Sequence, residues 1–344
     1  MNTFGRNFRV QVFGESHGEA IGVVIDGVKA GMPLCKEDFM EDIFRRKSGA
    51  KGTTPRIESD EPEFLSGVFE CHTTGAPLAI IFRNNNTRSS DYEALREVPR
   101  PGHADFTASV KWNGFNDPRG GGHFSGRLTL PLVAAGVIAK KQCRASLSEQ
   151  FGSNDISFQA GLKEIGGETD PSKWDALLEE TAREGDSLGG IVECRIDNVP
   201  AGLGNPFFDS VEALLSHAVF SIPGVRGIEF GDGFAAARMK GSEHNDPLML
   251  HSERSGLAPS GVKFTKNGAG GINGGITNGA QVVFRVAFKP TSSIAKTQKT
   301  LNIKTGETVS LNVPGRHDVC FALRTPVIVE AVAAIVLADL AYNI

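Results

Sequence analysis

The segment from residue 8 to residue 28 constrains the fold of this chain more than any other. Residues 8–13 are rich in strand-forming side chains, and residues 21–28 form a second, β-branched run. A short loop bracketed by Gly14 and Gly18 joins the two runs and carries Ser16 and His17. The chain is therefore predicted to begin as two consecutive strands, with a Ser-His pair in the turn between them.

The same loop matches the G-x-S-x-G pattern of the α/β-hydrolase nucleophile elbow, with Ser16 in the nucleophile position. That elbow needs a helix directly after the serine, whereas here a strand is predicted to follow. An α/β-hydrolase serine also comes after several strands, and this one lies near the N-terminus. A tight β-turn is the favoured interpretation, and a serine hydrolase is the alternative.

Composition narrows the class of protein. The formal net charge of the 344 residues is −4, which argues against general nucleic-acid binding. The 5 cysteines are scattered and form no CxxC pair, so neither a disulfide framework nor a metal site is predicted. The N-terminal sequence has no apolar leader, and the longest apolar run, residues 326–341, is interrupted by Glu330 and Asp339. We expect a soluble cytoplasmic protein.

Strand-like and helical segments do not alternate regularly along the chain. Further strands are predicted at residues 63–70, 77–82 and 281–289. Helices are predicted at residues 36–47, 128–141 and 170–184, with an apolar closing helix from Thr325-Pro326. This organisation favours an α+β fold with helices and sheets in separate layers over a doubly wound parallel sheet.

A short similarity between two segments of the chain indicates two related halves. Residues 24–32 (VIDGVKAGM) align with residues 195–203 (RIDNVPAGL), and a predicted helix follows each copy. A strand, a turn and a helix would form the repeated unit. We predict one domain over residues 1–344 with an internal pseudo-repeat, whose halves span about 1–150 and 151–344. Chance similarity over so short a segment is the alternative.

Three polar clusters in turns are candidates for chemistry. His17 lies between glycines, His103 lies between Pro101-Gly102 and Asp105, and residues 316–318 read Arg-His-Asp. Because histidine titrates near neutrality, each histidine is suited to move a proton. A purely structural loop histidine is the alternative in each case.

Cationic residues concentrate in the first third of an acidic chain. They are Arg45, Arg46, Lys47, Lys51, Arg56, Arg83, Arg88, Arg96, Arg100, Arg119 and Arg127. Guanidinium groups bind phosphate and carboxylate bidentately, so this concentration predicts a local anion site, with a solvated basic surface as the alternative. Glycine-rich residues 119–127 and 268–275 and the Lys-Pro-Thr-Ser-Ser run at 289–293 offer further donors to a phosphate.

Short motifs along nearly the whole chain resemble the chorismate synthase family. The matching segments are Gly14-Glu15-Ser16-His17-Gly18 with Asp26-Gly27, Gly120-Gly121-Gly122 with Ser125-Gly126-Arg127, Arg316-His317-Asp318 with Glu330-Ala331, Leu65-Ser66-Gly67-Val68-Phe69, Thr73-Thr74-Gly75, Ser90-Asp91-Tyr92, Pro101-Gly102-His103-Ala104-Asp105 and Lys289-Pro290-Thr291-Ser292-Ser293-Ile294. Many independent matches in the right order make the resemblance specific.

The resemblance implies a phosphate lyase of the shikimate pathway of aromatic amino-acid biosynthesis. It would convert 5-enolpyruvylshikimate 3-phosphate into chorismate and phosphate by trans-1,4-elimination, using reduced FMN. NADPH would act only indirectly, through an external flavin reductase. The implied fold is a β-α-β sandwich, with antiparallel sheets around helices, in a homotetramer. Loss of a proton and a phosphate needs an acid, a base and an anion clamp, which agrees with the histidines and arginines.

The resemblance also implies roles for individual residues. His17 would protonate the departing phosphate with help from Ser16, His103 would protonate or stabilise the reduced flavin, and Asp318 would act as a base near the flavin. Flavin contacts would come from His123, Phe124, Ser125, Gly274, Lys289, Pro290, Thr291, Ser292, Ser293 and Arg316. Substrate anions would be held by Arg46, Arg100 and Arg127, and Arg46 also matches a position assigned to NADP.

Two segments depart from the family pattern. The basic run at residues 45–51 is one residue shorter than usual, so Lys51 is only a candidate for a missing arginine contact. His123-Phe124 replaces the commoner Arg-Ser, so flavin contacts there would come from the backbone. A non-catalytic nucleotide-binding protein, which would tolerate loss of His17 and Asp318, is a further alternative.

Overall fold

The N-terminal part of the chain forms a five-stranded antiparallel sheet in the order β1-β2-β3-β7-β4. Its strands are β1 (Thr3–Phe4), β2 (Arg9–Gly14), β3 (Ala20–Asp26), β4 (Glu63–Ser66) and β7 (Leu78–Arg83). This computed structural model describes residues 1–54, 58–86, 94–151, 155–250, 262–313 and 317–342. β2 and β3 pair from Arg9↔Asp26 to Gly14↔Ile21, so the turn that carries Ser16 and His17 lies at the end of this hairpin.

A second antiparallel sheet has four strands in the order β10-β15-β9-β8. These are β8 (Ser157–Ile165), β9 (Gly190–Asp197), β10 (Val225–Phe230) and β15 (Val282–Phe288). The residues of β15 alternate between buried and half-buried, as the sequence alternation of residues 281–289 predicts for a strand with one face in the core.

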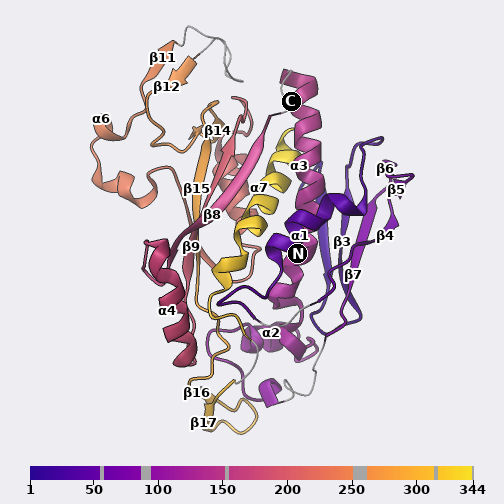
Figure 1. The fold of residues 1–344 in the computed structure, drawn as a ribbon, viewed down its shortest axis with the longest axis vertical. Coiled ribbons are helices and arrows are strands. Elements are labelled where there is room, and N and C mark those ends of the chain that lie inside the picture. The colour runs from indigo at the N-terminus through magenta and orange to yellow at the C-terminus, as the bar shows by residue number, and fades with distance from the viewer. Residues whose placement is uncertain (55–57, 87–93, 152–154, 251–261, 314–316, 343–344) are drawn as a thin grey trace.

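Two long helices lie between the sheets (Figure 1). Helix α3 (Thr129–Phe151) packs on β3 and β7, helix α7 (Pro326–Leu340) packs on β8 and β9, and the two helices pack on each other. Every residue of α7 from Val327 to Asp339 is buried, because the helix is apolar on all sides and must be enclosed by other elements. Helix α1 (Met40–Arg46) packs against α3, and α5 (Val211–Val219) against α7.

The other described elements are short or lie at the surface. The remaining α-helices are α2 (Asp105–Lys111), α4 (Pro171–Arg183) and α6 (Gly241–His244). The 3-10 helices are η1 (Lys36–Phe39), η3 (Ala94–Arg96), η4 (Arg119–Phe124), η5 (Gly126–Leu128), η6 (Phe207–Asp209), η7 (Gly233–Arg238) and η9 (Phe321–Arg324). Two-stranded hairpins pair β5 (Val68–Phe69) with β6 (His72–Thr73), β11 (Leu248–Leu250) with β12 (Val262–Phe264), β13 (Ile272–Asn273) with β14 (Ile276–Thr277), and β16 (Gln298–Leu301) with β17 (Thr308–Leu311).

Some element boundaries differ from the sequence predictions. The helix expected at residues 128–141 continues to Phe151, and the helix expected at residues 36–47 begins as the 3-10 turn η1 before α1. Helix α4 agrees with its prediction, since Asp170 caps it by accepting a hydrogen bond from the N–H of Ser172 at 3.0 Å. Across the described ranges, no helix has both the length and the apolarity needed to cross a membrane.

Candidate active site

One large cavity, of about 980 Å³, lies where the β2–β3 turn, the end of α1, the glycine-rich helix η4 and the start of η9 meet. Its lining divides into two parts. The apolar part includes Val10 and Val12 of β2, Leu132 of α3, and Val332 and Ile335 of α7. The polar part collects histidine, arginine, lysine and carboxylate side chains from segments far apart in the sequence. The cavity can therefore enclose a flat apolar group beside a strongly anionic one.

The Ser-His turn is built into the wall of this cavity. Ser16 is 1% exposed and His17 is 7% exposed, and His17 lines the cavity. The N–H of Ser16 donates to the carbonyl of Gly122 at 3.1 Å, and His123 Nδ1 lies 2.8 Å from the carbonyl of Gly14. Strand β3 follows the turn where a nucleophile elbow would need a helix, so the geometry of an α/β-hydrolase is absent.

The glycine run Gly120-Gly121-Gly122 is required by close packing. All three residues have positive φ, at 61°, 82° and 54°. A Cβ on Gly120 would collide with the His17 ring, and a Cβ on Gly121 would lie 3.4 Å from His103 Nε2. Glycine is therefore the residue that allows this loop to lie directly against both histidines.

His103 forms a charged cluster with two neighbours. Its Nδ1 lies 2.6 Å from Asp105 Oδ1, and Arg100 donates to both oxygens of Asp105 at 2.7 and 2.8 Å. Burial lowers the pKa of His103, and Arg100 adds to this effect while Asp105 opposes it. Hydrogen bonds and charge from Arg100 and His103 hold the pKa of Asp105 well below its ordinary value despite burial. A neutral His103 that donates from Nδ1 to Asp105 leaves Nε2 as an acceptor.

Asp318 lines the same cavity and is held in place by two hydrogen bonds. Its Oδ1 accepts from the N–H of Thr54 at 2.9 Å, and its Oδ2 accepts from Arg324 Nη2 at 2.7 Å. The neighbouring His317 also lines the cavity, and burial together with Arg100 lowers its pKa. Asp318 is thus a fixed carboxylate beside a histidine that favours its neutral form.

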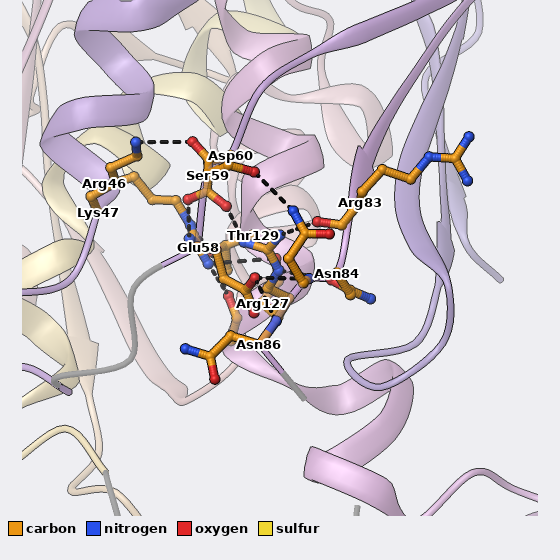
Figure 2. Close-up of polar contacts among 12 residues, drawn as sticks. Arg46, Lys47, Glu58, Ser59, Asp60, Arg83, Asn84, Asn86, Arg127 and Thr129 are labelled. Carbon is orange, nitrogen blue, oxygen red and sulfur yellow. Dashed lines mark hydrogen bonds and ion pairs between the residues drawn. The ribbon is translucent and has the colours of Figure 1, made fainter. Parts of the chain in front are cut away.

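Arg46 and Arg127 converge on a buried carboxylate, as Figure 2 shows. Arg127 pairs with one oxygen of Asp60, and Arg46 Nη1 lies 3.6 Å from the other. All three side chains are almost fully buried. Burial, together with the charges of Arg324 and Arg127, lowers the pKa of Arg46 to about 9, although Asp60 and Asp318 oppose this shift. Two guanidinium groups thus share the carboxylate of Asp60, and a bound anion would give them a further partner.

Three buried polar atoms that face this region have no hydrogen-bond partner among the described residues. They are Thr291 Oγ1, His317 Nε2 and Arg324 Nε. All three residues line the cavity. Buried polar groups in folded proteins are nearly always paired, so these atoms point to a ligand that binds here.

Comparison with known proteins gives the family. The family model described as chorismate synthase matches residues 8–342. A chorismate synthase from Chitinophaga pinensis is 61% identical over 339 residues, which cover 98% of this chain and 96% of that protein. The chain belongs to the chorismate synthase family. Its members are lyases of the shikimate pathway, and that enzyme class applies to this chain.

Less similar members of the family also match nearly the whole chain. A chorismate synthase from Dehalococcoides mccartyi is 45% identical over 365 residues, covering 99% of this chain and 96% of the relative. A solved structure described as the crystal structure of chorismate synthase is similar with a TM-score of 0.71 at 27% identity, covering 98% of this chain and 92% of the other. The mixed α and β fold is therefore that of a chorismate synthase.

Most residues expected from the resemblance to chorismate synthase lie at the cavity. Those that line it are His17, Arg46, Arg100, His103, His123, Phe124, Ser125, Arg127, Lys289, Pro290, Thr291, Ser292 and Asp318. Ser16 and Ser293 are buried and do not line the cavity, and Arg100 Nη1 donates to the Ser293 hydroxyl at 2.9 Å. Lys289 Nζ donates to Ser292 Oγ at 2.5 Å, and burial lowers the pKa of this lysine.

Two further expected residues, Lys51 and Gly274, lie away from the cavity. Lys51 pairs with Asp175 and Glu179 of α4 at 3.3 and 2.7 Å, and Gly274 lies in the β13–β14 turn; neither lines the cavity. Arg316 lies outside the described residues, as do Arg56, Arg88 and the segment 90–92.

Sequence reasoning did not single out two residues that shape the site in this chorismate synthase family member. Asp60 supplies the counter-charge for Arg46 and Arg127, and Arg324 holds Asp318. The acidic residues after the basic run were a weak signal for Asp60. No local pattern marked Arg324, because its partner is defined only by the folded chain.

Proposed function

We propose that this protein converts 5-enolpyruvylshikimate 3-phosphate into chorismate and phosphate by trans-1,4-elimination. One observation carries the proposal: a histidine, a fixed carboxylate and a buried arginine cluster line the same cavity. The elimination needs an acid, a base and an anion clamp, and these are the groups that are present.

The cavity fits reduced FMN as the cofactor. Its volume, about 980 Å³, is at the upper end for ligand sites, which suits a cofactor together with a substrate. Thr291 Oγ1 is buried without a partner among the described residues, in the run that holds Lys289 and Ser292. The proposed contacts are His123, Phe124, Ser125, Lys289, Pro290, Thr291, Ser292 and Ser293, with Arg316 outside the described residues. Reduced flavin, when bound, supplies an electron-rich ring that can exchange a proton with the substrate.

His17 is the proposed acid. Its ring lies against Gly120 in the same cavity wall as Arg127, so a phosphate held by the arginines would lie near it. A proton from His17 neutralises the leaving phosphate, and Arg46 and Arg127 stabilise the charge that develops on it. Arg100 is proposed to hold a substrate carboxylate. Ser16, buried next to His17 in the same turn, would assist by supporting the ring.

Asp318 and His103 act at the flavin side of the proposed site. Asp318 accepts two hydrogen bonds that fix its position, which suits a base that must meet a proton at one place. The Nδ1 of His103 is committed to Asp105, so its Nε2 is the atom that exchanges a proton or a hydrogen bond with the flavin. The apolar wall from β2, α3 and α7 excludes water from that side.

We propose that the fold is a β-α-β sandwich composed of two related halves. The Thr73 hydroxyl bridges a carbonyl and an N–H of segment 24–32 at 2.6 and 2.9 Å. The Thr277 hydroxyl bridges the equivalent carbonyl and N–H of segment 195–203 at 2.6 and 2.9 Å. In addition, β3 pairs with β7, and β9 with β15, in the same register relative to these segments. A superposition that left these strands unmatched would contradict the repeat.

We further propose a homotetramer that works in the cytoplasm and receives reduced flavin from a separate NADPH-dependent reductase. Large aromatic side chains at the surface support assembly, with Phe115, Phe207 and Phe208 exposed by 92%, 88% and 92%. Light scattering after gel filtration would give four times the chain mass of 36.6 kDa. A monomer at micromolar concentration would contradict the assembly.

An anaerobic assay tests the activity. The wild-type protein, with chemically reduced FMN and 5-enolpyruvylshikimate 3-phosphate, is expected to form chorismate, and oxidised FMN is expected to give none. His17→Ala and Asp318→Ala should each lower kcat by about two orders of magnitude or more. His72→Ala, on the exposed β5–β6 hairpin, and Asp175→Ala, on the outer face of α4, are matched controls.

The alternatives predict different results. Product with oxidised FMN, or full activity in both site variants, would refute the mechanism. A non-catalytic nucleotide-binding protein would bind flavin and form no chorismate. A serine hydrolase would form an acyl-enzyme that Ser16→Ala abolishes, and mass spectrometry would detect that adduct.

A further inference from the structure

Asn84 follows β7 directly, is half-buried and does not line the cavity. Its side chain nevertheless contacts two parts of the candidate site, of which Figure 2 labels one, Arg127. Nδ2 donates to the carbonyls of Gly18 and Glu15, at 2.9 and 3.1 Å, and Oδ1 accepts from Arg127 Nε at 3.1 Å. One amide thus uses both its N–H groups on the Ser-His turn and its oxygen on an arginine of the cavity.

These bonds hold the turn in addition to its contact with the glycine run. The two carbonyls flank Ser16 and His17 in the sequence, and the backbone N–H of Asn84 adds a bond to the carbonyl of Glu19 at 3.1 Å. The N–H of Ser16 is held separately, by the carbonyl of Gly122. The turn is therefore held by two segments, and the Asn84 side chain joins it to Arg127.

Arg127 is oriented by the same contact. Its Nη1 pairs with Asp60, its Nη2 donates to the carbonyl of Arg83 at 3.4 Å, and its Nε is directed at Asn84. Because all three guanidinium nitrogens of Arg127 make such contacts, the orientation of the guanidinium plane is fixed. The N–H groups that face the cavity therefore have a defined direction.

We propose that Asn84 is a positioning residue that holds the Ser16-His17 turn and Arg127 in a fixed relation. Asn84 touches neither substrate nor flavin; it sets the separation between the proposed proton donor and the proposed anion ligand. This inference rests on the proposed function, because it assigns a purpose to the distance between those two groups.

Neither aspartate nor alanine can make all the contacts that the amide of Asn84 makes. An aspartate at this position would still accept from Arg127, but its second oxygen would face the carbonyls of Glu15 and Gly18 and repel them. It would also neutralise part of the charge of Arg127. An alanine would release the turn and the arginine together without adding charge.

The test compares Asn84→Asp and Asn84→Ala with Asn85→Asp. Asn85 is the adjacent residue, is exposed, and bonds through its side chain to Ser59 Oγ at 3.2 Å, so its variant makes the same chemical change away from the turn. Both Asn84 variants should lower kcat by about 10- to 100-fold, since a displacement of about 1 Å costs roughly 100-fold. Asn84→Asp should also raise KM, and Asn85→Asp should leave both constants near wild type.

A second measurement needs neither flavin nor turnover. Inorganic phosphate should raise the melting temperature of the flavin-free wild type and of Asn85→Asp, and this shift should be smaller in Asn84→Asp. A residue with only a structural role would lower the melting temperature without phosphate and leave kcat, KM and the phosphate shift unchanged.

The outcomes separate the two hypotheses. An inactive wild type that still shows the phosphate shift contradicts the proposed function alone. An active wild type with Asn84 variants that match Asn85→Asp overturns the positioning role. Failure of both Asn84 variants to fold would also overturn it, because the residue would then be needed for folding as a whole.

Discussion

Gly120→Ala is the substitution that most directly tests the placement of His17. Gly120 has φ +61°, and a Cβ there would overlap Nδ1 and Cε1 of the His17 ring and lie 2.9 Å from Ser16 Oγ. Because carbon and nitrogen atoms pack at about 3.5 Å, the ring would have to retreat by about 1.5 Å. The main chain around Gly120 is itself constrained, since the next two residues also have positive φ.

The magnitude follows from two separate effects. A non-glycine residue at positive φ costs about 1–2 kcal/mol of stability. A displacement of a catalytic group by about 1 Å lowers the rate by roughly 100-fold. Gly120→Ala should therefore lower kcat by about 100-fold or more and lower the unfolding free energy only modestly.

Gly114→Ala is the matched control. Gly114 has φ +77°, and a Cβ there would meet no atom within 4 Å. It carries the same backbone strain without touching His17. Anaerobic chorismate formation and urea unfolding would be measured for both variants. If Gly120→Ala and Gly114→Ala had the same kcat, the position of the His17 ring would not matter for turnover, and the reasoning from the glycine run would be refuted.

Three further predictions concern stability, each followed by urea unfolding. Burial lowers the pKa of His103 and of His317, so as the pH falls the unfolded chain binds protons before the folded chain does. The unfolding free energy should therefore decrease from about pH 7.5 to about pH 5.5, by at most about 1.4 kcal/mol per pH unit for each proton. His317→Asn should make this decrease with pH less steep. Asp339→Ala should cost about 2–4 kcal/mol, because Oδ1 of this carboxylate accepts three backbone N–H groups of the N-terminal loop at 2.6–2.9 Å; an unchanged midpoint would contradict this. Glu330→Gln should cost about 1.5–3 kcal/mol, since it weakens the charge-assisted contacts that the buried Glu330 carboxylate makes with Arg45 and Lys140, both of which keep Asp42 as a partner. Glu149→Gln, in an exposed pair, should cost less than about 1 kcal/mol.

The sequence predicts the local elements of this protein well where one pattern decides them. The strand–turn–strand start, the capped helix α4 and the buried helix α7 all follow from residue types and their spacing. The end of α3 was placed too early because residues after Lys141 look polar. Cys143 and Leu147, four residues apart and both buried, carry the helical period onward, and no glycine or proline interrupts it.

Long-range pairing explains what the sequence could not predict. Lys51 lies in a basic run that suggested an anion contact, yet Asp175 and Glu179 of α4 lie beside it and pair with its charge. Asn84 sits in a run of three asparagines that are equivalent by local pattern. Only the folded chain distinguishes them, because the partner of the first is the turn between β2 and β3.

The charge balance of the cavity connects the fold to the proposed chemistry. The chain is acidic overall, but two buried arginines share one buried carboxylate at the cavity wall, and a third arginine lowers the pKa of Arg46 further. Asp60, that carboxylate, is itself held at φ +55°, a conformation a non-glycine residue adopts only under constraint from its surroundings. Strain and buried charge both oppose folding, so other parts of the core must supply the stability that maintains them. An anion bound at the arginines would remove part of this cost, which is why phosphate alone is expected to stabilise the flavin-free protein.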